Sequence, residues 1–137
     1  GWSTGARIGQ DDVLWKPPLA GPVGFHQDAA YISTQFEPAT NNSVTVWLAL
    51  DDADEETGVV EYVAGSHLWA APTDSATSAS FHGESDAYDT AVRHAARAAG
   101  HDPSTLSISR VPVRAGSAVF HHQDVWHGSA PNRSSTR

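Results

Sequence analysis

The feature that most constrains this chain is a series of short β-type runs separated by turn residues. The strongest run, Val44–Leu50, is rich in β-branched and aromatic residues. Its apolar residues occupy both parities, which predicts a strand covered on both faces. Val59–Val63 predicts a second strand, paired with the first across an acidic turn region. Further strands are expected at 106–113 and 117–122. Several short strands with one helix inserted between them are typical of a β-sandwich or barrel such as a jelly roll.

The remaining segments complete an all-β domain with one insertion. Residues 1–22 are punctuated by proline and glycine, so we expect extended edge segments there. Residues 70–85 are small and polar without periodicity, which indicates a surface loop or lid. Residues 86–100 carry helical signal that ends at Gly100. No composition break divides 1–137, so we expect one domain. The absent initiating Met and the polar last residues indicate a piece of a longer polypeptide, truncated at both ends.

Charge and composition exclude several functions. The chain has 137 residues, with 16 acidic and 8 basic side chains and a net charge of −8, which argues against nucleic acid or an anionic membrane as partner. No apolar run approaches the roughly 18 residues of a membrane span. Because cysteine is absent, disulfides and thiolate metal sites are excluded. We therefore expect a soluble, cytoplasmic protein with a small-molecule substrate; its oligomeric state is left open.

Imidazole and carboxylate are the strong transition-metal ligands that remain. His26 and Asp28 lie at i and i+2, and on an extended strand both would project from one face while Gln27 points away. A third ligand must come from a distant segment, and His127 stands at what we interpret as the end of another strand. Two histidines and one carboxylate on one side of a metal leave positions open for a co-substrate and oxygen, as in non-haem iron sites.

A second copy of the same tripeptide, His122-Gln123-Asp124, is a weaker candidate. His127 lies only three residues beyond Asp124, so all of its ligands would come from one short segment. We interpret His121 and His122 as core residues, as supports for a ligand or as residues that face the substrate, and Asp124 as a turn acid. The histidines of the insert are expected to be solvated: His82, His94 and His101.

Taken together, several motifs resemble the phytanoyl-CoA dioxygenase family of iron(II)- and 2-oxoglutarate-dependent oxygenases. They are Lys16-Pro17-Pro18, His26-Gln27-Asp28 with Tyr31, Val46–Leu50, the corner Ala64-Gly65-Ser66-His67, and Trp126-His127-Gly128-Ser129 with Asn132. The resemblance implies a double-stranded β-helix, a jelly-roll barrel, in which His26, Asp28 and His127 hold the catalytic iron. It also implies 2-oxoglutarate and O2 as co-substrates.

The far carboxylate of 2-oxoglutarate needs a cation, and a bidentate arginine suits a planar carboxylate. In the family this arginine stands ten or eleven residues beyond the distal histidine, which favours Arg137; Arg133 is the alternative, as is a residue beyond the chain end. Ser129 matches a position that helps to bind the same carboxylate, or is a simple turn residue. Trp47 matches a position that lines the co-substrate pocket, which is compatible with core packing.

Two further residues receive structural interpretations. His67 follows a corner where the family usually has proline in place of Ala64, and we expect it to orient a loop. Lys16 could face the pocket, but we interpret it as an exposed lysine at a strand end.

The resemblance predicts oxidative decarboxylation of 2-oxoglutarate to succinate, coupled to hydroxylation of a small metabolite. Halogenating relatives replace the carboxylate, so Asp28 favours hydroxylation; desaturation and ring closure stay open. Two alternatives are a cupin-type metal enzyme that does not use 2-oxoglutarate and a non-catalytic jelly-roll binding module.

Overall fold

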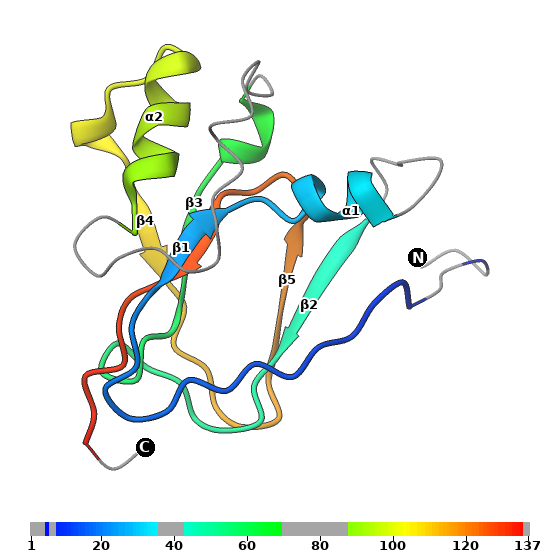
Figure 1. Ribbon diagram of the computed structural model, residues 1–137, viewed down its shortest axis with the longest axis vertical. Coiled ribbons are helices and arrows are strands. Elements are labelled where there is room, and N and C mark those ends of the chain that lie inside the picture. The colour runs from blue at the N-terminus through cyan, green and yellow to red at the C-terminus, as the bar shows by residue number, and fades with distance from the viewer. Residues whose placement is uncertain (1–4, 6–7, 36–42, 70–87, 136–137) are drawn as a thin grey trace.

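The computed structural model describes residues 5, 8–35, 43–69 and 88–135, and its strands form two antiparallel sheets (Figure 1). The larger sheet has the order β1-β6-β3-β4, and the smaller one pairs β2 with β5. The elements in chain order are β1 (Val23–His26), α1 (Ala29–Gln35), β2 (Val44–Leu48), β3 (Val60–Val63), η1 (Ser66–Leu68), α2 (Thr90–Ala98), η3 (Pro103–Thr105), β4 (Ile108–Arg110), β5 (Ala118–His122) and β6 (His127–Ser129).

The predicted pairing of the Val44 and Val59 strands is wrong. β2 pairs with β5, with Thr45 opposite His121, whereas β3 pairs with β4 and β6. Two-residue turns hold consecutive strands in one sheet. The connection after β2 is much longer, and its residue Ala53 bridges to Val113. This length lets the chain cross from one sheet to the other.

The strand β2 is covered on one face only, contrary to the prediction. Thr45 and Trp47 are partly buried, whereas Val46 and Leu48 are 51% and 54% exposed. A two-stranded sheet has two faces, and the described part of the fold packs against one of them. Within the part of the chain that the structure describes, Val46 and Leu48 on the other face therefore remain accessible to solvent.

The helices agree in part with the sequence prediction. The predicted helix at 86–100 is present as α2, and Gly100 follows it with φ +82°. The helix α1 was not predicted, because seven residues are too few to show a helical period. The predicted loop at 70–85 lies outside the described residues. Among the described residues no helix has the length and apolar character needed to cross a bilayer.

The main core lies where α2 packs on the larger sheet. Its fully buried side chains include Phe25, Val92 and Trp126, joined by Val63 and Ala95. Gly128 allows β1 and β6 to approach closely, because a Cβ there would lie 2.9 Å from the Val23 carbonyl oxygen. Burial of this apolar surface on one side of the sheet leaves the opposite side facing β2 and β5.

Candidate metal centre

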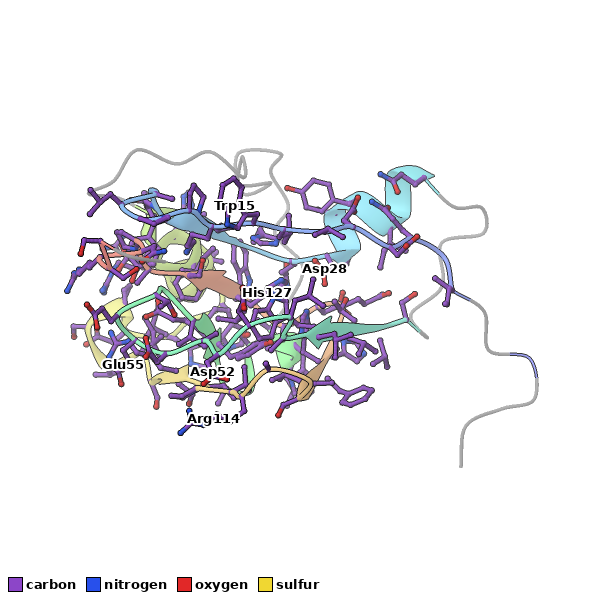
Figure 2. All side chains as sticks on the ribbon, turned by 90° about the horizontal axis from the view of Figure 1, so that it is seen from below. Trp15, Asp28, Asp52, Glu55, Arg114 and His127 are labelled. Atoms are coloured by element: carbon purple, nitrogen blue, oxygen red, sulfur yellow. The ribbon has the colours of Figure 1, made fainter. Side chains whose placement is uncertain are left out.

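Three side chains from separate segments meet between the two sheets. His26 ends β1, Asp28 lies just before α1, and His127 begins β6. One ligand atom from each residue lies within 4.8 Å of the others. His26 and His127 are register partners in the β1–β6 pair, which explains why residues far apart in the sequence meet. Asp28 and His127 lie in the interior of the molecule, whereas Arg114 lies at its periphery (Figure 2).

Asp28 reaches this point by a turn and not by strand alternation, so the predicted geometry was wrong. The strand ends at His26, and the Asp28 carbonyl accepts hydrogen bonds from the backbone N–H groups of Tyr31 and Ile32, at 2.9 and 3.0 Å. The side chain of Gln27 turns elsewhere, since its Nε2 donates to the Asp124 carbonyl. The first turn of α1 therefore positions the carboxylate.

Both histidines present Nε2 to the site. The Nδ1 atom of His26 lies 2.8 Å from the Gly24 carbonyl oxygen, and that of His127 lies 3.0 Å from the Val125 carbonyl oxygen. A carbonyl can only accept, so each Nδ1 carries the hydrogen and each Nε2 keeps its lone pair. The Nε2 atoms of His26 and His127 lie 3.8 and 3.5 Å from Asp28 Oδ1. The backbone thus orients both imidazoles as a metal requires.

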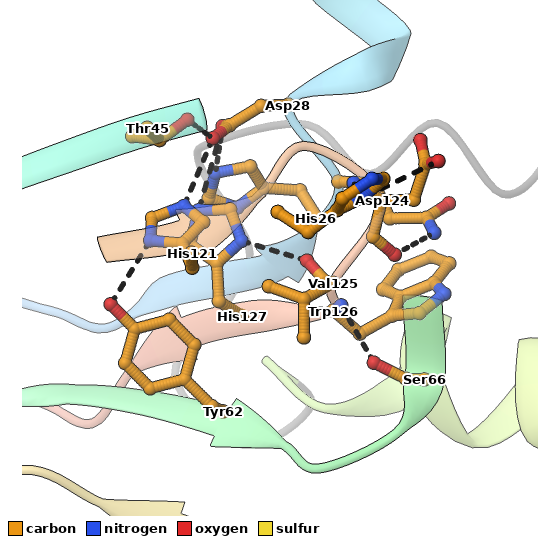
Figure 3. A network of polar contacts seen from close by, with 12 residues as sticks. His26, Asp28, Thr45, Tyr62, Ser66, His121, Asp124, Val125, Trp126 and His127 are labelled. Carbon is orange, nitrogen blue, oxygen red and sulfur yellow. Dashed lines mark hydrogen bonds and ion pairs between the residues drawn. The ribbon is translucent and has the colours of Figure 1, made fainter. Parts of the chain in front are cut away.

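The second carboxylate oxygen of Asp28 is occupied by hydrogen bonds from the smaller sheet. Thr45 Oγ1 donates to Oδ2, and His121 Nε2 lies 3.0 Å from the same oxygen (Figure 3). Because Oδ2 is held in this way, Oδ1 is the atom directed at the two imidazoles. The arrangement favours coordination of a metal by one carboxylate oxygen.

His121 supports Asp28 and does not compete as a ligand. Tyr62 Oη lies 3.2 Å from His121 Nδ1. Because the ionised Asp28 carboxylate can only accept, the hydrogen of His121 is on Nε2, and its Nδ1 accepts from the Tyr62 hydroxyl. Its Nε2 then lacks a free lone pair, although its ring lies only 4.4 Å from that of His127. The hydrogen-bonded series Tyr62–His121–Asp28 connects the two sheets.

The protonation states suit metal binding. Burial and, to a smaller extent, the charge of nearby His26 lower the pKa of His127 to about 4. Burial also lowers the pKa of His26. Burial alone would raise the pKa of Asp28, but the hydrogen bond from His121, the charge of His127 and the hydrogen bond from Thr45 outweigh it and lower that pKa to about 2. At neutral pH the site therefore offers two neutral imidazoles and one carboxylate.

This donor set fits iron(II). Two imidazole nitrogens and one carboxylate oxygen on one side of an ion, with other positions open, are typical of non-haem iron oxygenases. The second His-Gln-Asp copy is arranged differently: His122 Nδ1 and Asp124 Oδ2 are 3.6 Å apart, and Gln123 is buried. Among the described residues only the first copy belongs to a three-ligand group.

The other predicted residues divide into those near this centre and those elsewhere. Ser129 is buried on β6 and accepts a hydrogen bond from Lys16 Nζ. The interpretation of Lys16 as an exposed strand-end residue is therefore wrong. Trp47 shares the partly buried face of β2 with Thr45. Arg133 is exposed, with its backbone N–H bonded to the Glu56 carbonyl at 2.8 Å. Arg137 lies outside the described residues.

Among the described residues, the remaining histidines are not part of the three-ligand group. His67 is exposed in η1, and its ring lies 5.6 Å from that of His122. Its neighbour Ser66 holds the corner, because the Ser66 hydroxyl accepts a 2.9 Å hydrogen bond from the Trp126 N–H. His94 and His101 are exposed as predicted, although the His101 ring lies 5.1 Å from that of Trp69, at a tilt of 31°. His82 lies outside the described residues.

Sequence reasoning did not identify Thr45 and Tyr62 as parts of the site. Both look like ordinary strand residues, and only the pairing of β2 with β5 and of β3 with β6 brings them to Asp28 and His121. A weak signal was available, since Thr45 has a polar side chain within an otherwise apolar run.

Residues 4–137 match the protein family described as Phytanoyl-CoA dioxygenase (PhyH). Among curated proteins, the chain is 29% identical over 132 residues to the "Probable alpha-ketoglutarate-dependent hypophosphite dioxygenase" of Stutzerimonas stutzeri, covering 96% of this chain and 42% of that protein. It is 32% identical over 129 residues to "Phytanoyl-CoA dioxygenase domain-containing protein 1" of Mus musculus, covering 89% of this chain and 38% of that protein. The chain thus spans about two fifths of the length of these relatives.

Solved structures agree with the sequence comparison. The epimerase SnoN from nogalamycin biosynthesis, in complex with Fe3+, alpha ketoglutarate and nogalamycin RO, is 25% identical with a TM-score of 0.59, covering 83% of this chain and 38% of SnoN. The carbocyclase SnoK from the same biosynthesis is 26% identical with a TM-score of 0.52, covering 88% of this chain and 42% of SnoK. The predicted all-β class and jelly-roll architecture are confirmed.

Proposed function

Because this chain belongs to the phytanoyl-CoA dioxygenase family, we propose that it carries the Fe(II) centre of a 2-oxoglutarate-dependent oxygenase that hydroxylates a small molecule. His26, Asp28 and His127 would hold the iron. We further propose that 1–137 is the single double-stranded β-helix core of a longer protein. Localisation in the cytoplasm stays a prediction.

The observation that carries this proposal is the convergence of the three ligand atoms within 4.8 Å, with each imidazole hydrogen already directed at a backbone carbonyl. The relative SnoN was crystallised with Fe3+ and alpha ketoglutarate, which supports the same pair of groups here. When bound, iron with 2-oxoglutarate and O2 supplies the oxidant for a C–H bond, with succinate and CO2 as products. The protein's own contribution is to hold the ligands, exclude water and place the substrate.

We propose that the substrate occupies a cavity next to His121, the residue whose Nε2 lies 3.0 Å from Asp28 Oδ2. Its volume is about 260 Å³, and Tyr62 and His121 belong to its lining together with apolar side chains of Val119 and Val125. That volume is slightly below the usual range for small-molecule sites. It favours a small metabolite over a coenzyme A conjugate. One relative is named for hypophosphite, which is a small substrate.

The presence of Asp28 argues against halogenation. A halogenating centre would need this ligand position for halide, and here the carboxylate fills it, so we favour hydroxylation. The names of SnoN and SnoK, an epimerase and a carbocyclase, show that related proteins are assigned other outcomes. Substrate identity decides between these outcomes.

The test compares metal binding and succinate formation in four proteins: the unsubstituted protein, Asp28→Ala, His127→Ala and the control Asp124→Ala. Asp124 is the matched control because it ends the second His-Gln-Asp copy. We expect one Fe(II) to bind under anaerobic conditions, and 2-oxoglutarate to yield succinate when O2 is admitted. Asp28→Ala and His127→Ala should lose both, with circular dichroism unchanged, whereas Asp124→Ala should retain both.

Two results would contradict the proposal. Succinate formation that survives Asp28→Ala would show that this carboxylate is not a ligand. Iron binding that is unaffected by 2-oxoglutarate, with no succinate, would favour a cupin-type enzyme or a binding module.

A further inference from the structure

The cavity next to His121 combines apolar side chains with imidazole rings. Among the described residues, its lining consists of Tyr62, His67, Val119, Phe120, His121, His122 and Val125. Three of these side chains are histidines, and none of them is acidic. A molecule in this cavity therefore meets apolar surface and hydrogen-bonding rings, but no carboxylate in the lining that the structure describes.

Two of the polar residues in the lining already use their hydrogens within the protein. The His121 Nε2–H is directed at Asp28 Oδ2, 3.0 Å away, and the Tyr62 hydroxyl donates to His121 Nδ1 at 3.2 Å (Figure 3). A hydroxyl and a neutral imidazole each have one hydrogen to donate. Hydrogen bonds from the lining side chains to a substrate must therefore come from the other two polar residues, His67 and His122.

The ring of His122 is oriented by the backbone of the following turn. The Asp124 backbone N–H donates to His122 Nδ1 at 3.1 Å, whereas the Asp124 carboxylate oxygen Oδ2 is 3.6 Å from the same nitrogen, beyond hydrogen-bond range. Because Nδ1 accepts this bond, the ring hydrogen is on Nε2. Within the described part of the chain no residue accepts a hydrogen bond from His122 Nε2, and the side chain is 41% exposed. This N–H is thus available to a molecule in the cavity.

The cavity lies at the open edge of β5, near the end of the strand. His121 and His122 are successive residues of β5, so their side chains leave opposite faces of the strand. Among the described strands β5 pairs only with β2, and its other edge is open. A cavity that both side chains line can pass around the strand there. A substrate that contacts His122 at one end can therefore extend toward His121, the residue that supports Asp28.

The short helix η1 brings a second imidazole to the same place. The ring centroids of His67 and His122 are 5.6 Å apart. Gly65 at φ +79° precedes η1, and the Ser66 hydroxyl accepts a 2.9 Å hydrogen bond from the Trp126 N–H, so the corner that carries His67 is held in place. Two rings from separate segments at this separation allow one group with two or three oxygens to contact both.

A group with negative charge gains most from these donors. A hydrogen bond from an N–H to an ionised acceptor is roughly twice as strong as one to a neutral acceptor. The acid beside His122 is Asp124, which lies near Nδ1 and not near the Nε2–H that faces a ligand. The arrangement therefore favours a carboxylate or a phosphorus oxyanion over a neutral amide or alcohol.

We propose that His122, with His67 beside it, binds an oxyanion of the substrate in the cavity next to His121. The substrate would then be a small acid, with its apolar part against Val119 and Val125. This proposal rests on the proposed function, because it names the substrate class of the same centre. It makes His122 and His67 determinants of specificity, without a part in holding the iron.

The test compares butyrate with butyramide, which has nearly the same shape and no charge. In protein labelled with carbon-13 histidine, NMR spectra follow the imidazole signals one by one, and each signal is assigned by its absence in a single variant. We expect butyrate to shift the His122 and His67 signals in a saturable way, and butyramide to leave them nearly unchanged. In His122→Leu the butyrate affinity, followed at His67, should fall about 10- to 100-fold, as for loss of a hydrogen bond to a charged group.

His94→Leu is the matched control, because it removes an exposed imidazole on α2 that does not line the cavity. It should bind butyrate as the unsubstituted protein does. His122→Gln keeps an N–H donor and should retain part of the affinity. If His122→Leu does not fold, His122→Gln and the shifts in the unsubstituted protein provide the test.

Three results would overturn the proposal. The first is an equal response to butyrate and butyramide, and the second is an unchanged butyrate affinity in His122→Leu. The third is a butyrate shift that appears at His26 and His127 while His122 does not respond, because this would place the carboxylate at the metal centre.

The same spectra distinguish this proposal from the proposed function. Zn(II), which is diamagnetic, replaces Fe(II), and its addition with 2-oxoglutarate should shift the signals of His26 and His127. If these signals do not move, the proposed function fails. A preference for butyrate that depends on His122 in the metal-free protein would still establish the oxyanion site.

Discussion

Replacement of His121 by phenylalanine tests whether hydrogen bonds to Asp28 set the affinity of the metal centre. Phenylalanine fills a similar volume but removes the Nε2–H that lies 3.0 Å from Asp28 Oδ2 and the acceptor for Tyr62. A hydrogen bond to a charged group contributes about 1.5–3 kcal/mol. The expected result is therefore a 10- to 100-fold weaker metal affinity, as found for residues that orient ligands.

The assay is competition for Fe(II) or Co(II) against a coloured chelator without O2, with far-ultraviolet circular dichroism as the check on folding. Thr45→Val is the matched variant, because it removes the other hydrogen bond to the same oxygen. His121→Gln keeps an N–H donor and should restore part of the affinity. If His121→Phe and Thr45→Val both bind metal normally, the carboxylate does not depend on these bonds. If His121→Phe fails as completely as His127→Ala, His121 is a ligand.

Three further predictions concern stability. As the pH falls from 6.5 to 4, the free energy of unfolding of the metal-free protein should fall by on the order of 3 kcal/mol. The reason is that the pKa of His127 is lowered from 6.5 to about 4 in the folded protein, so the unfolded chain binds the proton first. Urea titrations that show the same stability across this pH range would contradict the prediction. Glu61→Ala should lower the free energy of unfolding by about 2–3 kcal/mol, since it leaves Arg110 and the Tyr88 hydroxyl without their buried acceptor. Chemical denaturation measures this change, and a change under about 0.5 kcal/mol would argue against a stabilising role of these two interactions of Glu61 in β3. Leu19→Gly should raise the free energy of unfolding by up to about 1 kcal/mol, and with it the melting temperature, because Leu19 has φ +60° in a turn that the Ala20 N–H closes on the Pro17 carbonyl. A lower melting temperature would mean that the exposed side chain contributes more than the strain costs.

The sequence predicted which three side chains converge better than it predicted the way in which they meet. His26, Asp28 and His127 were identified by residue type, by spacing and by resemblance, and the structure brings them together. The sequence analysis assigned Asp28 to an extended strand, whereas the carboxylate lies in the turn before α1. The helix α1 has only seven residues, which is too short for a helical period to be recognised in the sequence, so an extended strand was the simpler interpretation.

Strand pairing was less predictable than strand position. The runs at 44–50 and 59–63 do contain β2 and β3, but nothing local specifies which sheet each one joins. Pairing depends on contacts between distant residues, such as Thr45 opposite His121, and these contacts are the ones that build the site. For the same reason Thr45 and Tyr62 could not be derived from the residues alone, and support of a ligand was only one of the interpretations left open for His121.

Asp28 is the point at which the two sheets are connected by polar side chains. It follows β1 of the larger sheet, accepts hydrogen bonds from Thr45 on β2 and His121 on β5, and through His121 reaches Tyr62 on β3. An ion held by His26, Asp28 and His127 would therefore restrain both layers at once. Amide hydrogen exchange in β2 and β5 should slow on iron loading, even though neither strand provides a ligand. Exchange rates in the smaller sheet would then report whether iron occupies a centre whose three proposed ligands lie on the larger sheet and in the turn after β1.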